Sequence, residues 1–87
     1  MIFQFFKWDL KNILHIARHH VTPEEAEDTC YSKPFIYRTG MNRYCILGRT
    51  NAGRYLTVIV ELLDKETVRV ITARDMSPAE RKRFYGR

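Results

Sequence analysis

The chain of 87 residues is 45% hydrophobic and 13% aromatic, which excludes a disordered tail and predicts a single folded domain over residues 1–87. Its formal net charge is +5, and its 10 arginines outnumber its five lysines. This bias favours nucleic acid as a partner, because arginine binds phosphate through two parallel N–H groups. No stretch approaches the ~18 apolar residues of a membrane-spanning helix, and the first residues lack the basic segment of a secretory signal. We therefore expect a cytoplasmic chain. The alternative to a nucleic-acid partner is a soluble basic domain whose charges only solvate it.

The first third of the chain predicts one edge strand and two helices. Ile2–Phe6 is short, apolar and aromatic, which suits a strand at a sheet edge. Asp9 suits the N-cap of a helix over Leu10–His20, in which recurring apolar residues predict one buried face. These apolar residues are Leu10, Ile13, Leu14, Ala17 and Val21. The sequence Thr22-Pro23-Glu24-Glu25 is a capping box with proline in the first turn, and it predicts a second, acidic helix to about Tyr31.

The middle of the chain predicts four strands connected by short turns. The strands are rich in β-branched and aromatic residues, and turn-forming residues separate them. Their ranges are Phe35–Arg38, Arg43–Thr50, Arg54–Leu63 and Val68–Asp75. Turns this short join antiparallel neighbours, so we expect an antiparallel four-stranded meander sheet. Ser77, Pro78 and Glu80 then predict a C-terminal helix that ends near Tyr85, and the whole is an α+β fold with two N-terminal helices.

Three histidines gather at the end of the first predicted helix. His15 and His19 are four residues apart on its polar face, with Lys11 and Arg18, and this spacing can hold one metal ion. No third ligand follows at a suitable distance in the sequence, so we expect neither a metal nor a cofactor. Because histidine titrates near neutral pH, His19 or His20 can act as a general acid or base. The alternative is that both only stabilise the C-terminus of the helix.

Arginines recur along the predicted strands. Arg49 and Arg54 flank a hairpin loop, and Arg69 and Arg74 lie in the last strand, where regular alternation would place them on opposite faces. Neighbouring strands are ~5 Å apart, so several guanidinium groups can converge on one phosphate. Glu61 is an acid well inside a strand. We expect it to pair with Arg69 across the final hairpin; the alternative is that it serves as a general base.

These residue types suit cleavage of RNA without a metal ion. Such cleavage needs a base to activate the 2′-hydroxyl group, cations to stabilise the charged transition state, and an acid for the leaving 5′-oxygen. No P-loop, dinucleotide motif or Ser-His-Asp spacing competes with this interpretation. Two other functions stay open. One is a module that binds RNA or a partner protein without cutting, and the other is a structural subunit whose arginines pair only with its own acids.

Short motifs occur in a fixed order along nearly the whole chain. They are Trp8-Asp9 with Lys11-Asn12, Arg18-His19-His20-Val21, Glu24-Glu25-Ala26, Arg43-Tyr44, Ile46–Thr50, Gly53-Arg54, Arg69–Arg74, Glu80-Arg81 and Tyr85. Together, in this order, they resemble the BrnT family of bacterial toxins. His20 departs from the family pattern, which usually has glycine at this position. Glycine permits a left-handed helix end, so we expect a different local backbone at His20.

The resemblance implies a RelE-like ribonuclease fold, and it makes residues 1–87 a toxin domain of a type II toxin–antitoxin system. It also implies a metal-independent endoribonuclease that cleaves RNA and arrests growth. The implied partner is a BrnA-like antitoxin with a ribbon-helix-helix DNA-binding region, which neutralises the toxin in a hetero-oligomer. The catalytic candidates are His19, Arg49, Arg69 and Arg74. The RNA-binding candidates are Trp8, Lys11, Arg54 and, in the basic run near the end, Arg81 and Arg83. The same fold without catalysis, as an RNA- or antitoxin-binding module, is the alternative.

Overall fold

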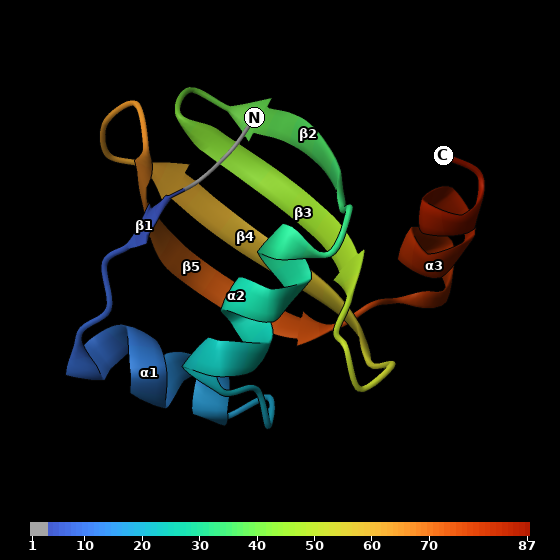
Figure 1. The fold of residues 1–87 in the computed structure, drawn as a ribbon, viewed down its shortest axis with the longest axis horizontal. Coiled ribbons are helices and arrows are strands. Elements are labelled where there is room, and N and C mark those ends of the chain that lie inside the picture. Colours follow the sequence, from blue (N-terminus) through green and yellow to red (C-terminus); the bar gives the residue numbers. More distant parts are fainter. Residues whose placement is uncertain (1–3) are drawn as a thin grey trace.

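The structure is a computed structural model that describes residues 4–87, with one five-stranded sheet and three helices (Figure 1). In chain order the elements are β1 (Phe5–Phe6), α1 (Leu10–Ala17), α2 (Pro23–Tyr31), β2 (Phe35–Gly40), β3 (Arg43–Arg49), β4 (Tyr55–Leu62), β5 (Thr67–Asp75) and α3 (Pro78–Tyr85). The strands lie in the order β1-β5-β4-β3-β2. Helices α1 and α2 cover one face of the sheet, and α3 packs on the other face near the end of β3.

The four long strands form the predicted antiparallel meander, because β2 to β5 each pair with the next strand in the chain. A fifth strand makes the sheet mixed, since β1 pairs in parallel with Thr67 and Val68 of β5. The expected four-stranded, wholly antiparallel sheet is thus corrected to five strands. Of the predicted edge strand, Ile2 and Phe3 lie outside the described residues. Because β1 spans only Phe5 and Phe6, the outer edge of β5 beyond Val68 has no strand partner between residues 4 and 87.

The sheet has a packed core on each face. On one face, Val58 and Val60 of β4 are fully buried against α1 and α2. On the other face, Phe84 of α3 packs with Leu47 of β3. Gly48 of β3 lets α2 approach closely, because an added Cβ would lie 2.6 Å from the carbonyl oxygen of Thr29.

Helix α1 buries a different face from the predicted one. Leu10 and Leu14 are 70% and 58% exposed, whereas Ile16 and Asn12 are buried. Asn12 Nδ2 donates a 2.9 Å hydrogen bond to the carbonyl oxygen of Val70, on the free edge of β5. The helix therefore turns a polar residue inwards, where it satisfies a backbone group that lacks a strand partner, and leaves two leucines facing outwards.

Helix α1 ends at Ala17 rather than at His20, and residues 18–20 form a turn. The N–H of Val21 donates to the carbonyl of Ile16, and the N–H of His20 donates to the carbonyl of Ala17. This pair of bonds is a Schellman motif. His20 has φ of 60°, the left-handed conformation that glycine would adopt at this position. The expectation that the backbone differs at His20 is therefore wrong. The chain keeps the left-handed conformation with histidine in place of glycine, which costs about 1 kcal/mol.

The pairing of β4 with β5 shifts by one residue between Ile59 and Val60, which leaves Ile71 as a bulge. Side chains alternate faces along a strand, so one extra residue reverses the alternation beyond it. The register therefore places Arg69 and Arg74 on the same face of the sheet, contrary to the expectation for a regular strand.

Candidate active site

Two neighbouring pockets lie along α1. The smaller, which we call the α1 pocket, has a volume of about 220 Å³ and is lined by Lys11, Asn12, His15, Arg69 and Ile71. The larger has a volume of about 370 Å³ and is lined by Lys11, Leu14, His15 and Arg18. Lys11 and His15 are four residues apart on one side of the helix, so they border both pockets. An anion in the α1 pocket would meet a lysine, an arginine and a histidine.

Asp9 fixes two walls of the α1 pocket. Its Oδ1 accepts a 2.9 Å hydrogen bond from the backbone N–H of Asn12, which caps α1. Its Oδ2 accepts a 3.1 Å hydrogen bond from Nη2 of Arg69. Since a guanidinium group has five N–H donors, Arg69 retains donors for a phosphate. Glu61 lies opposite Arg69 in the strand register, but within the described chain the ion pair of Arg69 is with Asp9 and not with Glu61.

The rings of His15 and His19 lie edge to face, with centroids 6.0 Å apart and an interplanar angle of 72°. His15 is partly buried at the pocket and His19 is exposed. Two imidazoles this close can supply both a general base and a general acid to one substrate. Among residues 4–87, no three histidine, cysteine or carboxylate side chains gather closely enough to hold a metal ion.

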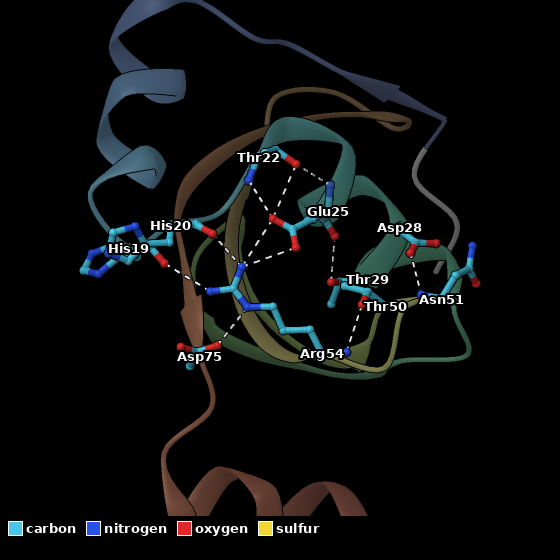
Figure 2. Close-up of polar contacts among 10 residues, drawn as sticks. All are labelled: His19, His20, Thr22, Glu25, Asp28, Thr29, Thr50, Asn51, Arg54 and Asp75. Atoms are coloured by element: carbon cyan, nitrogen blue, oxygen red, sulfur yellow. Dashed lines mark hydrogen bonds and ion pairs between the residues drawn. The ribbon is translucent and has the colours of Figure 1, made fainter.

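Arg54 connects the turn after α1 to α2 and to the end of β5 (Figure 2). Its Nη2 donates to the carbonyl oxygen of His19 at 3.2 Å, and its Nη1 donates to that of His20. Nη1 also lies 3.3 Å from the carboxylate of Glu25, and Nε donates to Asp75 at 3.0 Å. Hydrogen bonding to Asp75 and then to Glu25 raises the pKa of Arg54 above its ordinary value.

All three side-chain nitrogens of Arg54 are used in this way, so the contacts give Arg54 a positioning role. Its role in binding RNA stays a prediction that competes with these contacts. Arg54 holds the backbone of His19, and through Glu25 it also contacts the capping box that starts α2. Figure 2 shows a parallel contact at the other end of α2, where the N–H of Asn51 donates to the Asp28 carboxylate at 2.7 Å. The two contacts attach the hairpin between β3 and β4 to the helical layer.

Arg74 is held at the base of α3. Its Nη1 and Nη2 donate to the two carboxylate oxygens of Glu80 at 2.6 and 3.0 Å. Glu80 also accepts hydrogen bonds from the Thr57 hydroxyl and the Ser77 backbone N–H. Arg74 above all lowers the pKa of Glu80, to about 2. The expected catalytic role of Arg74 thus competes with a structural role, because both terminal nitrogens of its guanidinium group already donate to Glu80.

The Glu80 pair makes a testable contribution to acid stability. The pKa of Glu80 falls from 4.5 to about 2, so the charged pair stabilises the fold fully above about pH 5 and is lost as the pH falls towards 2. A shift of this size corresponds to roughly 3 kcal/mol, but solvent screening reduces it because the Arg74 side chain is 39% exposed. We expect Glu80→Gln to lower the free energy of unfolding by about 1–2 kcal/mol at pH 7 and by little near pH 2.

Urea unfolding at a series of pH values measures this difference. Glu24→Gln is the matched control, because Glu24 is an exposed residue of α2, and we expect it to change the unfolding free energy by less than about 0.5 kcal/mol. A Glu80→Gln deficit that did not shrink in acid would contradict the assigned pair.

The other arginine candidates lie over aromatic rings around α3. The guanidinium carbons of Arg49 and Arg81 lie 5.1 and 4.1 Å from the ring centre of Tyr55, and that of Arg83 lies 3.9 Å from the ring centre of Tyr37. The structure therefore does not bring Arg49 together with Arg69 and His19. The sequence motifs did not identify Tyr55 as a site residue. Its position directly opposite Arg49 across the β3–β4 hairpin could have indicated that the two side chains are in contact.

The family model for the BrnT ribonuclease toxin of type II toxin–antitoxin systems matches residues 8–80. The chain belongs to the BrnT family. Among solved structures, the crystal structure of the ribonuclease toxin BrnT from Brucella abortus matches with a TM-score of 0.65 and 20% identity, over 88% of this chain and 99% of that chain. At this identity the likeness shows a shared fold. No curated protein matches the chain.

The BrnT match contains the α1 pocket and the Arg54 contacts, and it ends at Glu80. Arg81 and Arg83 lie beyond it. Trp8 lies inside it and has a structural contact, because its Nε1 donates a 2.7 Å hydrogen bond to Glu27 and its ring packs against the core. No helix between residues 4 and 87 is long and apolar enough to cross a membrane.

Proposed function

We propose that this BrnT-family chain is a cytoplasmic, metal-independent endoribonuclease with a RelE-like fold, which cleaves RNA in the α1 pocket and arrests growth. The observation that carries the proposal is the pocket itself, which gathers Lys11, His15 and Arg69, with His19 beside it. A BrnT-family ribonuclease must bind a phosphodiester, and this set of cations and imidazoles suits that charge. The non-catalytic binding module is the competing function.

The proposed reaction is an internal transfer at one phosphodiester. His15 accepts the proton of the 2′-hydroxyl group as its oxygen attacks the adjacent phosphorus. The bond between phosphorus and the 5′-oxygen breaks, and His19 donates a proton to the departing oxygen. Lys11 and Arg69 stabilise the extra negative charge on the phosphoryl oxygens in the transition state. The products are a 2′,3′-cyclic phosphate and a 5′-hydroxyl group.

The test is incubation of the purified chain with end-labelled RNA in excess EDTA. We expect cleavage to continue, and the fragments to carry a 2′,3′-cyclic phosphate and a 5′-hydroxyl group. The matched control is the His15→Ala and His19→Ala double variant, prepared in the same way to exclude a contaminating nuclease. RNA that is bound but left intact by the wild-type chain would contradict the proposed activity and would favour the binding module.

We assign the antitoxin contact to the outer face of α1. Leu10 and Leu14 are exposed there, and the basic side chains of Lys11 and Arg18 lie beside them at the larger pocket. The sequence of α1 contains no acidic residue. An acidic amphipathic segment of a BrnA-like ribbon-helix-helix antitoxin suits this surface, because apolar burial and charge complementarity act together. Such a segment would also cover Lys11 and His15 and so block the α1 pocket.

We expect Leu10→Asp with Leu14→Asp to weaken antitoxin binding by at least about a hundredfold, since the change removes two apolar contacts and repels an acidic partner. Isothermal titration with the cognate antitoxin measures the loss. Met41→Asp is the matched control, because Met41 is also an exposed apolar residue but lies in the turn between β2 and β3. Equal affinity of the double variant and the wild type would contradict this docking surface.

A further inference from the structure

A third pocket lies away from α1, between α3, the β3–β4 hairpin and the segment that joins α2 to β2. We call it the α3 pocket; its volume is about 550 Å³. Its lining includes the side chains of Lys33, Arg49, Arg87, Tyr55, Phe84 and Tyr85. Three of these residues are cationic and three are aromatic, and none of the described lining residues is acidic. The proposed cleavage reaction does not use this pocket.

One aromatic ring of the α3 pocket is exposed and yet held in place. Tyr85 is 60% exposed. Its hydroxyl group nevertheless donates a 2.8 Å hydrogen bond to the Tyr55 hydroxyl and accepts a 3.0 Å hydrogen bond from Nη2 of Arg81. The neighbouring Phe84 is buried and anchors the helix. A ring fixed at its polar end presents its face with little rotamer entropy left to lose on binding.

The two arginines of the α3 pocket lie over aromatic rings, and within residues 4–87 neither forms an ion pair with an acid. Arg49 donates from Nε to the carbonyl of Gly53 and lies over the Tyr55 ring, so its Nη groups keep donors for a ligand. Arg87 lies over the Phe84 ring, with its guanidinium carbon 3.7 Å from the ring centre. Guanidinium planes stacked on aromatic rings are themselves surfaces on which nucleobases stack.

We propose that the α3 pocket binds an unpaired nucleotide of the RNA, with the base stacked on Tyr85 and the phosphate held by Arg49, Lys33 and Arg87. This inference rests on the proposed ribonuclease function and adds the substrate class, which is single-stranded RNA. In an A-form duplex the bases are stacked on one another and paired, so the ring of Tyr85 cannot reach a base face. A protein ligand of acidic character would use the cations but would not need the exposed ring.

The test is fluorescence anisotropy with a 2′-O-methyl RNA of roughly ten nucleotides, single-stranded or annealed to its complement. The methyl group removes the attacking hydroxyl and so prevents cleavage. We expect Tyr85→Leu to weaken binding of the single strand about tenfold and binding of the duplex less than twofold. Tyr85→Phe keeps the ring and should retain single-strand affinity within about threefold. A Tyr85→Leu protein that binds the single strand as well as the wild type, or that loses both ligands equally, would overturn the proposal.

Lys33→Glu gives a second test that does not alter the aromatic cluster. It reverses one charge in the α3 pocket, and we expect weaker binding of the single strand and a smaller dependence of affinity on salt. An unchanged affinity would count against the pocket.

If the wild-type chain bound the single strand through Tyr85 but cut no RNA, the proposed cleavage would fail while this inference stood. If it cut RNA and Tyr85→Leu bound normally, the reverse would hold.

Discussion

Replacement of Arg69 by alanine should lower the rate of RNA cleavage by about 10²–10³-fold. Arg69 is the arginine that lines the α1 pocket, and the bond of its Nη2 to Asp9 fixes its orientation there. The guanidinium group would donate to the phosphoryl oxygens as charge develops, and alanine removes both the charge and the donors. Single-turnover cleavage with enzyme in excess measures this effect without a contribution from product release.

The matched control for Arg69→Ala is Arg38→Ala, which removes the same charge from an exposed residue of β2. We expect the control to cleave at a rate within about threefold of the wild type, because RNA binding weakens only slightly when one remote charge is lost. The ion pair of Arg69 with Asp9 is partly exposed on both sides, so Arg69→Ala should cost less than about 1 kcal/mol of stability. Equal rates for the two variants would remove Arg69 from the site.

Replacement of Arg54 by alanine should lower the free energy of unfolding by about 2 kcal/mol. The loss comes mainly from the carbonyl oxygens of His19 and His20 and from the partly buried Glu25, which lose a charged donor together. The bond to Asp75 adds little, because the side chain of Asp75 is 70% exposed. Urea unfolding of the wild type and the variant measures the difference.

Arg54→Ala should also slow cleavage about tenfold under conditions in which the variant is folded, because the turn that carries His19 is no longer held and the imidazole is misplaced. Arg54→Lys keeps the charge, but a single ammonium group cannot reach all four acceptors, so we expect an intermediate loss of stability. A stability within about 0.5 kcal/mol of the wild type for Arg54→Ala would show that the contacts in Figure 2 contribute little to the fold.

The meander order of β2 to β5 and the helix caps could be predicted from the sequence because they depend on local chemistry, whereas the parallel pairing of β1 with β5 could not. The capping boxes at Thr22 and Ser77 are both present, and the short turns do join antiparallel neighbours. The buried face of α1 could not be predicted in this way. Its leucines are spaced as a core stripe would be, but α1 lies at a free strand edge, where Asn12 is buried to satisfy a backbone carbonyl and Leu14 is left outside.

The candidate site was predictable as a set of residue types and not as a set of roles. Arginines that bind phosphate and arginines that pair with a carboxylate look alike in a sequence. The partner decides between them, and the carboxylates of Glu25 and Glu80 reach Arg54 and Arg74 from elements that only the fold brings near. The strand bulge at Ile71 is equally invisible, because no glycine or proline marks it, and it places both arginines of β5 on one face.

The most direct test of the α1 pocket is an NMR titration of the wild-type chain with a single-stranded 2′-O-methyl RNA, which binds without being cleaved. We expect the backbone amide signals of Lys11, His15, His19 and Arg69 and the imidazole signals of the two histidines to shift in proportion to occupancy, with a second set of shifts at Tyr85 and Arg87. Saturable binding that leaves the signals of Lys11, His15 and Arg69 unmoved would contradict the assignment of the α1 pocket as the place where RNA is cut.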